Sequence, residues 1–236
     1  MSERDEVLAR AVLYRWAARL FFYPDEATLQ ALAGGAAQTE MAAAVAALPR
    51  REALTTALAE VQAASAALEH EEPGLAGEHT HLFARSVRCP PYESSYAGER
   101  APLRTHDLAE IAGFYAVFGV QVSEERRELP DHVSLELEFL SYLCAKEVYA
   151  LEHGWRREAG LCRAGRGRFL REHLGQWFPA FAERLTQYAR LRFYPAAAGL
   201  TQALLEADPM AAPASCSDAD PVLLGGSCAD VIDTSP

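Results

Sequence analysis

Apolar residues recur at helical spacing from the start of the chain. Between residues 5 and 22, two neighbouring apolar stripes indicate a helix with a broad buried face. Pro24 ends this pattern, and Asp25 can cap a short second helix that closes at Gly34. No alternation of apolar and polar residues competes with the helical spacing, so we expect an all-α protein.

The longest apolar pattern runs through residues 133–151, where two stripes predict a central and largely buried helix. Proline and glycine residues divide the rest of the pattern into shorter helices. These span residues 37–48, 50–69, 76–83, 105–118, 156–164, 168–176, 178–191 and 194–207. The expected architecture is a compact single-domain bundle of about ten helices.

After Asp208 the composition changes to Ala, Pro, Ser, Gly and Asp, with few apolar anchors. Such a segment cannot bury enough apolar surface to offset the entropy lost on ordering it. We therefore expect an all-helical domain over residues 1–208 and a flexible C-terminal tail over residues 209–236.

Charge and cysteine content narrow the partners and the compartment. The chain holds 33 acidic residues against 22 Lys and Arg, a formal net charge of −11. Such a surface repels nucleic acid and anionic lipid but attracts a basic peptide, so we expect no nucleic acid partner and no membrane insertion. The acidic start is unlike an export signal, and the five cysteines form no Cys-x-x-Cys pair. A cytoplasmic protein fits these features.

One candidate binding segment is the loop at residues 90–96, which reads Pro-Pro-Tyr-Glu-Ser-Ser-Tyr. Tyr92, Glu93 and Tyr96 give it the aromatic and polar composition of a peptide-contacting surface. The alternative is a packed loop that its tyrosines anchor to the core.

A second candidate lies where a connector meets the central helix. Asp131 and His132 follow Pro130 there, and Glu128 and Glu136 add carboxylates on either side. The structural alternative is that Asp131 caps the helix and that Glu136 holds His132 one turn on. Carboxylates on a buried helix need partners or water, which a groove beside them would supply.

Catalytic and metal-binding signatures are weak. The chain has no glycine-rich phosphate loop, no nucleophile elbow and no His-Glu-x-x-His, so we expect neither an enzyme nor a bound cofactor. The alternative enzyme class is an all-helical metal-dependent phosphohydrolase that uses Asp131 and His132, although their order is inverted. A group of possible ligands in one half of the chain lacks the spacing of a tetrahedral metal site. It comprises His79, His81, Cys89, His106 and His132.

Three blocks in order, at residues 82–96, 107–119 and 128–140, together with the opening helix at residues 15–24, resemble the TorD/DmsD/NarJ family of molybdoenzyme assembly chaperones. The likeness spans about residues 7–205. Proline directly before Asp131 departs from the Glu-Pro-x-Asp-His pattern of TorD and DmsD. This spacing is closer to the NarJ branch.

The resemblance implies an all-helical cytoplasmic chaperone that is a monomer or a homodimer. Its implied partner is the apo catalytic subunit of a molybdoenzyme of the dimethyl sulfoxide reductase type. The chaperone binds the twin-arginine signal or N-terminal segment of that subunit and holds it for insertion of the molybdopterin cofactor before export. The family's Asp-His pair, associated with signal-peptide recognition, carries over to Asp131 and His132.

Overall fold

The computed structural model describes residues 2–68, 74–84, 88–96, 104–123 and 128–211, and most residues in these ranges are helical. The all-α prediction is confirmed, with ten α-helices in the described residues. They are α1 (Glu3–Phe21), α2 (Glu26–Ala33), α3 (Ala36–Ala46), α4 (Glu52–Ala67), α5 (Gly74–His79), α6 (Arg104–Val117), α7 (Val133–Glu152), α8 (Arg156–Glu172), α9 (Leu174–Tyr188) and α10 (Phe193–Ala207). A π-helical turn, η2 (Thr80–Ala84), extends α5, and a 3₁₀ turn, η3 (Glu93–Ser95), lies in the loop before α6.

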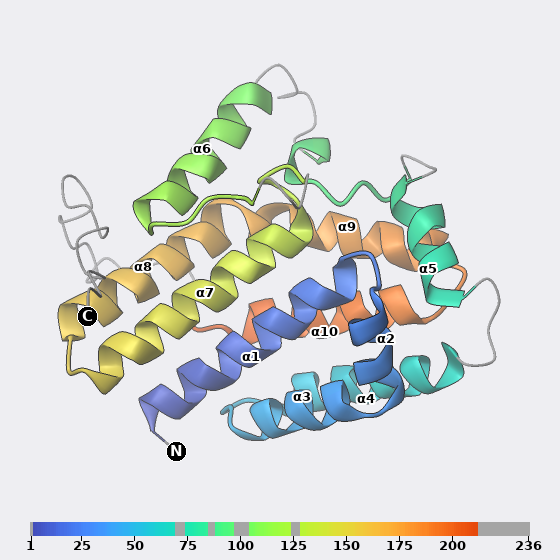
Figure 1. Cartoon of the computed structure of the whole chain (residues 1–236), viewed down its shortest axis with the longest axis horizontal. Helices are drawn as coiled ribbons and strands as arrows, with labels where there is room; N and C mark the ends of the chain where they lie inside the picture. The colour runs from blue at the N-terminus through green and yellow to red at the C-terminus, as the bar shows by residue number, and fades with distance from the viewer. Residues whose placement is uncertain (1, 69–73, 85–87, 97–103, 124–127, 212–236) are drawn as a thin grey trace.

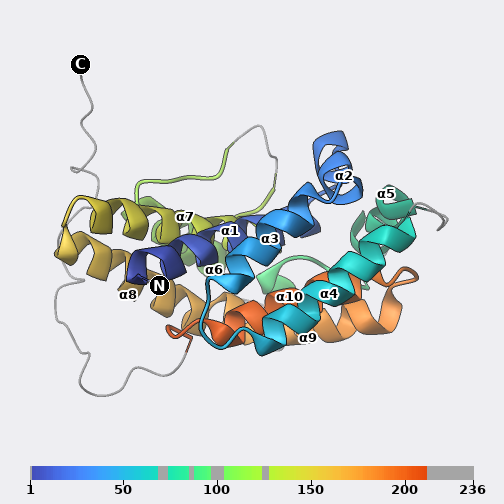
Figure 2. The ribbon, with the colours of Figure 1, turned by 90° about the horizontal axis from the view of Figure 1, so that it is seen from below.

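Three long helices, α1, α7 and α8, lie side by side across the molecule (Figure 1). Helices α9 and α10 form a second row behind them, and α3 and α4 close the edge opposite α6 (Figures 1 and 2). The central position predicted for residues 133–151 is confirmed, because α7 packs between α1 and α8 and buries most of its side chains.

The first two helices begin where their capping residues lie. The Ser2 hydroxyl accepts from the Asp5 backbone nitrogen while the Asp5 carboxylate accepts from Ser2, which is a capping box. The Asp25 carboxylate caps α2 by accepting from the Thr28 nitrogen at 2.7 Å, as the sequence predicted. None of the described helices combines the length and apolarity needed to cross a bilayer.

The break predicted between residues 164 and 168 is wrong, since α8 runs without interruption from Arg156 to Glu172. A Cβ atom at Gly165 would lie 2.3 Å from the ring of Phe118. This glycine therefore makes room for the Phe118 ring within a continuous helix and is not a helix end. The real break falls at His173, whose φ of −123° and ψ of −103° leave the helical region, and α9 begins at Leu174.

A buried ionic network holds the ends of the bundle together. Arg166, which is 2% exposed, pairs with Glu147 on α7 and with Asp208 directly after α10. The hydroxyl of Tyr14 on α1 donates to Asp208 at 2.9 Å. Buried charges are tolerated when they are paired in this way. The network therefore joins α1, α7, α8 and the end of α10.

The described part of the chain extends slightly beyond Asp208. The backbone nitrogen of Met210 donates to the Asp208 carboxylate at 2.9 Å, and Arg171 donates to the carbonyl of Met210 at 2.8 Å. Residues 209–211, the first part of the predicted tail, thus lie against the helical core. The remainder of that predicted tail, residues 212–236, lies outside the described residues.

Candidate functional site

The two candidate segments lie against each other. The backbone nitrogen of Glu93 donates to the carbonyl of Asp131 at 3.0 Å, and that of Val133 donates to the carbonyl of Pro91 at 2.8 Å. These bonds form an isolated antiparallel bridge between the loop and the start of α7. Two motifs that are separate in the sequence are therefore one structural unit.

Asp131 anchors the loop and does not cap α7. Its side chain is buried, and one carboxylate oxygen accepts from the backbone nitrogen of Ser94 at 3.0 Å, which fixes η3. The cap of α7 is His132, whose Nδ1 accepts from the Ser134 nitrogen at 3.1 Å. The interpretation of Asp131 as a helix cap, with His132 held by Glu136, is therefore wrong.

His132 lies between two aromatic rings. It stacks on Phe22 with 5.7 Å between ring centroids and meets the edge of Tyr92 at 5.2 Å. Burial of the imidazole lowers its pKa to about 3, and nearby His79 acts in the same direction. His132 is therefore neutral at physiological pH and joins α1, α7 and the loop by packing.

The two tyrosines of the loop have different surroundings. The hydroxyl of Tyr92 donates to the Glu128 carboxylate at 2.8 Å, and both residues are half-buried. Tyr96 packs against Trp177 at 5.3 Å between centroids, with the guanidinium of Arg184 on its ring at 5.6 Å. Tyr96 thus anchors the loop to α9, whereas Tyr92 and Glu128 reach the molecular surface.

The carboxyl groups of Glu136, which is fully buried, and of Glu93, which is partly exposed, lie near each other. Burial raises the pKa of Glu136 well above its ordinary range, and the charges of Glu93 and Asp131 add to this effect. The raised pKa favours the protonated form of the Glu136 carboxyl, whose other oxygen accepts a hydrogen bond from Trp177 Nε1 at 3.2 Å. The other side of Glu93 faces His173, with 3.3 Å between Oε1 and Nδ1.

A shallow groove of about 200 Å³ adjoins this unit. The hydroxyl of Tyr115 in its wall donates to the carbonyl of Pro130 at 2.8 Å, so the groove begins beside the residue that precedes Asp131. Most of its lining is apolar, and it includes one carboxylate. The lining residues are Tyr115, Val120, Gln121, Val122, Leu135, Glu138, Phe139 and Tyr142.

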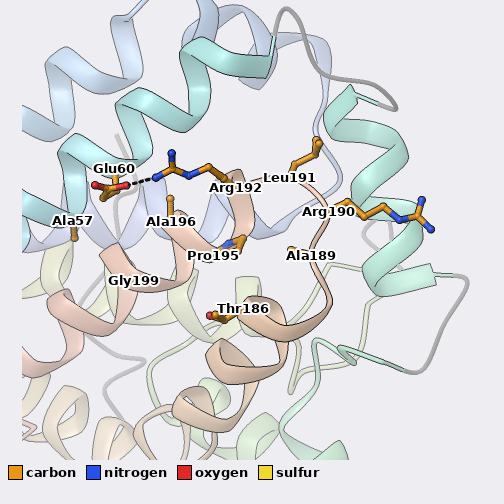
Figure 3. A pocket seen from close by; sticks show the side chains of 10 residues that line it. All are labelled: Ala57, Glu60, Thr186, Ala189, Arg190, Leu191, Arg192, Pro195, Ala196 and Gly199. Carbon is orange, nitrogen blue, oxygen red and sulfur yellow. Dashed lines mark hydrogen bonds and ion pairs between the residues drawn. The ribbon is translucent and has the colours of Figure 1, made fainter.

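A larger open groove, of about 420 Å³, lies elsewhere, between α4 and the junction of α9 with α10 (Figure 3). Arg192 pairs with Glu60 across it at 2.9 Å, whereas the side chain of Arg190 points away (Figure 3). None of the candidate residues from the sequence lines this groove.

Within the described residues, the possible metal ligands named from the sequence form no group of three that could hold a metal ion. His79 packs between Tyr23 and Phe83, and burial lowers its pKa to about 4. Cys89 is buried, which raises the pKa of its thiol to about 11. The side chain of His106 lies outside the described residues.

Two residues of the unit, Trp177 and His173, were not predicted from the sequence. Trp177 and His173 contact Glu136 and Glu93, but they lie on the α8–α9 segment, far from either motif in the chain. Helical periodicity marks Trp177 only as a core residue, and no local spacing connects His173 with Glu93. The signal that reveals them is the three-dimensional contact itself.

The sequence of this chain is similar to a known protein family and to several named relatives. A sequence model of the nitrate reductase delta subunit family matches residues 37–183. The selenate reductase assembly chaperone protein of Thauera selenatis is 40% identical over 114 residues, which cover 47% of this chain and 58% of the relative. The chlorate reductase assembly chaperone protein of Ideonella dechloratans is 41% identical over 103 residues, covering 41% and 52%. Chaperone protein TorD of Vibrio cholerae is 33% identical over 136 residues, covering 57% and 60%.

The chain spans between half and two thirds of the length of these relatives. All three of these relatives carry chaperone names. The resemblance drawn from the three sequence blocks is confirmed: this chain belongs to the nitrate reductase delta subunit family, whose model matches more than half of its length.

Proposed function

We propose that this chain is a cytoplasmic assembly chaperone for a molybdoenzyme of the dimethyl sulfoxide reductase type. In this proposal it binds the twin-arginine signal or N-terminal segment of the apo catalytic subunit and holds it for insertion of the molybdopterin cofactor. The chaperone names of the relatives support the class. The observation that carries the proposal is the pairing of the 90–96 loop with the start of α7, on which all seven candidate residues converge.

The candidate residues divide into two roles by burial. Asp131, His132 and Glu136 are buried, so a peptide at the surface does not touch them in this conformation. With Tyr96 they position the loop. Glu93 is partly exposed, and Tyr92 and Glu128 lie at the surface, so these three are the proposed contacts of the client segment.

The adjoining groove provides the second half of the binding surface. Its apolar wall, which includes Leu135 and Phe139, suits the apolar stretch that follows the arginines of such a signal. Glu138 in the groove and Glu128, which is bonded to Tyr92, suit guanidinium groups, which bind carboxylates with charge-assisted hydrogen bonds. The net charge of −11 would also speed the encounter with a basic segment.

The test is a calorimetric titration with a synthetic peptide of about 20 residues that carries two adjacent arginines before an apolar stretch. Glu128→Gln and Glu138→Gln should each weaken binding by about tenfold to a hundredfold, because each removes a charge-assisted hydrogen bond of about 1.5–3 kcal/mol. Glu183→Gln, an exposed carboxylate on α9, is the matched control and should bind like the wild type. Equal affinity for all four proteins would reject this surface.

A further inference from the structure

A second cluster of polar groups lies where α6 meets the junction of α8 and α9. A ring nitrogen of His173 and one carboxylate oxygen each from Glu110 and Glu172 lie within 4.8 Å of one another. The two carboxylates are exposed, and the imidazole is buried beneath them at 4% exposure. Sequence spacing gave no sign of this cluster, because Glu110 is far from the other two residues in the chain.

The imidazole of His173 is already oriented. Its Nδ1 lies 3.3 Å from Glu93 Oε1, and its ring packs against Phe169 at 4.9 Å between centroids. The other nitrogen, Nε2, is buried and has no hydrogen-bond partner within the described residues. A buried polar nitrogen without a hydrogen-bond partner is uncommon in proteins, and one explanation is that it binds a ligand.

We propose that Glu110, Glu172 and Nε2 of His173 form a binding site for a divalent transition-metal cation, of which Zn²⁺ is the representative. One imidazole with two carboxylates is a donor set that Zn²⁺ accepts, and a fourth position remains for water. Metal-binding histidines usually direct their second nitrogen to a carboxylate, which is the relation of His173 to Glu93. In a bound state the carboxylate oxygens would lie about 2.0–2.2 Å from the metal.

Arg168 is a built-in competitor for this site. It pairs with Glu172 at 2.7 Å, and its guanidinium lies over the ring of Phe114 at 5.5 Å. Because both Arg168 and Glu172 are about half exposed, their ion pair is weak and a cation can displace it. A bound cation would fasten α6 to the end of α8, next to the loop that contains Glu93.

The experiment is a calorimetric titration of the chelator-treated full chain with Zn²⁺ alone. We expect one ion per chain, and at least a tenfold weaker affinity in both Glu110→Gln and Glu172→Gln. Arg168→Gln should tighten binding about twofold to fivefold, since it removes the competing ion pair. Glu183→Gln is the matched control and should bind Zn²⁺ like the wild type.

Thermal melts of the metal-free variants establish that each substitution leaves the fold intact. Zn²⁺ should raise the melting temperature of the wild type and of Glu183→Gln, and should do so less in Glu110→Gln and Glu172→Gln. Absence of stoichiometric binding, or equal affinity in all of the glutamate variants, overturns the proposal. Because this readout needs no peptide, its failure would leave the proposed chaperone function untouched.

Discussion

The carboxylate of Asp131 accepts a hydrogen bond from the backbone nitrogen of Ser94 at 3.0 Å, across 37 positions of sequence. This bond connects the start of the central helix with a loop that has little other regular structure. This buried side chain therefore reinforces the two backbone hydrogen bonds that join the loop to the start of α7.

Asp131→Ala should destabilise the protein by about 1.5–3 kcal/mol, because it leaves the Ser94 nitrogen without a partner inside the protein. Asp131→Asn keeps an acceptor oxygen at this position and should cost less. Urea unfolding of both variants measures the difference. Equal losses for Ala and Asn would show that the hydrogen bond to Ser94 contributes nothing.

Glu136→Gln should stabilise the protein, and increasingly so toward high pH. The pKa of Glu136 is raised on folding, so the unfolded chain loses this proton near pH ~4.5 while the folded chain keeps it. Wild-type stability then falls as pH rises through that range, by at most about 1.4 kcal/mol per pH unit. Glutamine stays neutral in both states and removes this loss. Thermal melts from about pH 5 to pH 8 should show the gap between variant and wild type widening with pH.

His132→Asn should make the protein less sensitive to acid. Burial lowers the pKa of His132 to about 3, so below pH ~6.5 the unfolded chain takes up a proton that the folded chain refuses. The stability that neutral His132 contributes is present above pH ~6.5 and is lost as pH falls toward 3. Asparagine keeps the N-cap acceptor for the Ser134 nitrogen without titrating.

The measurement for His132 is urea unfolding at about pH 5 and pH 7.5, compared with the wild type. His153→Asn, at an exposed histidine, serves as the control and should retain the wild-type dependence on pH. An unchanged acid sensitivity in His132→Asn would place the responsible group elsewhere, with His79 as the next candidate because its pKa is also lowered, to about 4.

Arg166→Met should destabilise the protein by about 3–5 kcal/mol, since it leaves Glu147 and Asp208 buried without their cation. Arg168→Met, two positions along α8, removes only a half-exposed pair and should cost less than about 1 kcal/mol. Denaturant unfolding of the two variants side by side tests this contrast. Similar losses would mean that the network around Arg166 is not buried in solution.

Truncation of the chain separates its packed end from the rest of the predicted tail. Removal of residues after Ala211 should leave the melting temperature nearly unchanged, because every described contact of the C-terminal end is retained. Removal of residues after Ala207 takes away Asp208 and should lower the melting temperature by several degrees, by about 4 °C or more. A large fall for the chain that ends at Ala211 would show that residues 212–236 also pack on the core.

Much of the fold follows from periodicity and caps. Asp25 begins α2, and the stripes of residues 133–151 form the central α7, because these features depend on neighbouring residues. The predicted helix break at residues 164–168 was wrong because it depended on a contact between residues that are distant in the sequence. Gly165 is needed because the ring of Phe118, the residue that follows α6, lies against it. This contact joins distant parts of the chain, so the neighbouring residues of Gly165 do not reveal it.

In the candidate site, too, features set by neighbouring residues could be predicted and features set by distant contacts could not. The composition of the 90–96 loop and the position of Asp131 picked out the unit, but they did not reveal which side chains are buried. Asp131 at a helix start is a cap by local rules, yet its carboxylate turns to Ser94, and His132 caps the helix in its place. Neither Trp177 nor His173 can be connected with the motifs until the fold brings α9 against them.

The position of Asp208 has a consequence for how the chain folds. The charge of Arg166 and the hydroxyl of Tyr14, on α8 and α1, are both satisfied by a residue that follows the last helix. A chain that emerges from its N-terminus can therefore form α1 early but cannot complete the environment of α1 until residue 208 arrives. Such long-range closure slows folding, so the nascent chain leaves the surroundings of α1 incomplete until residue 208 has been made.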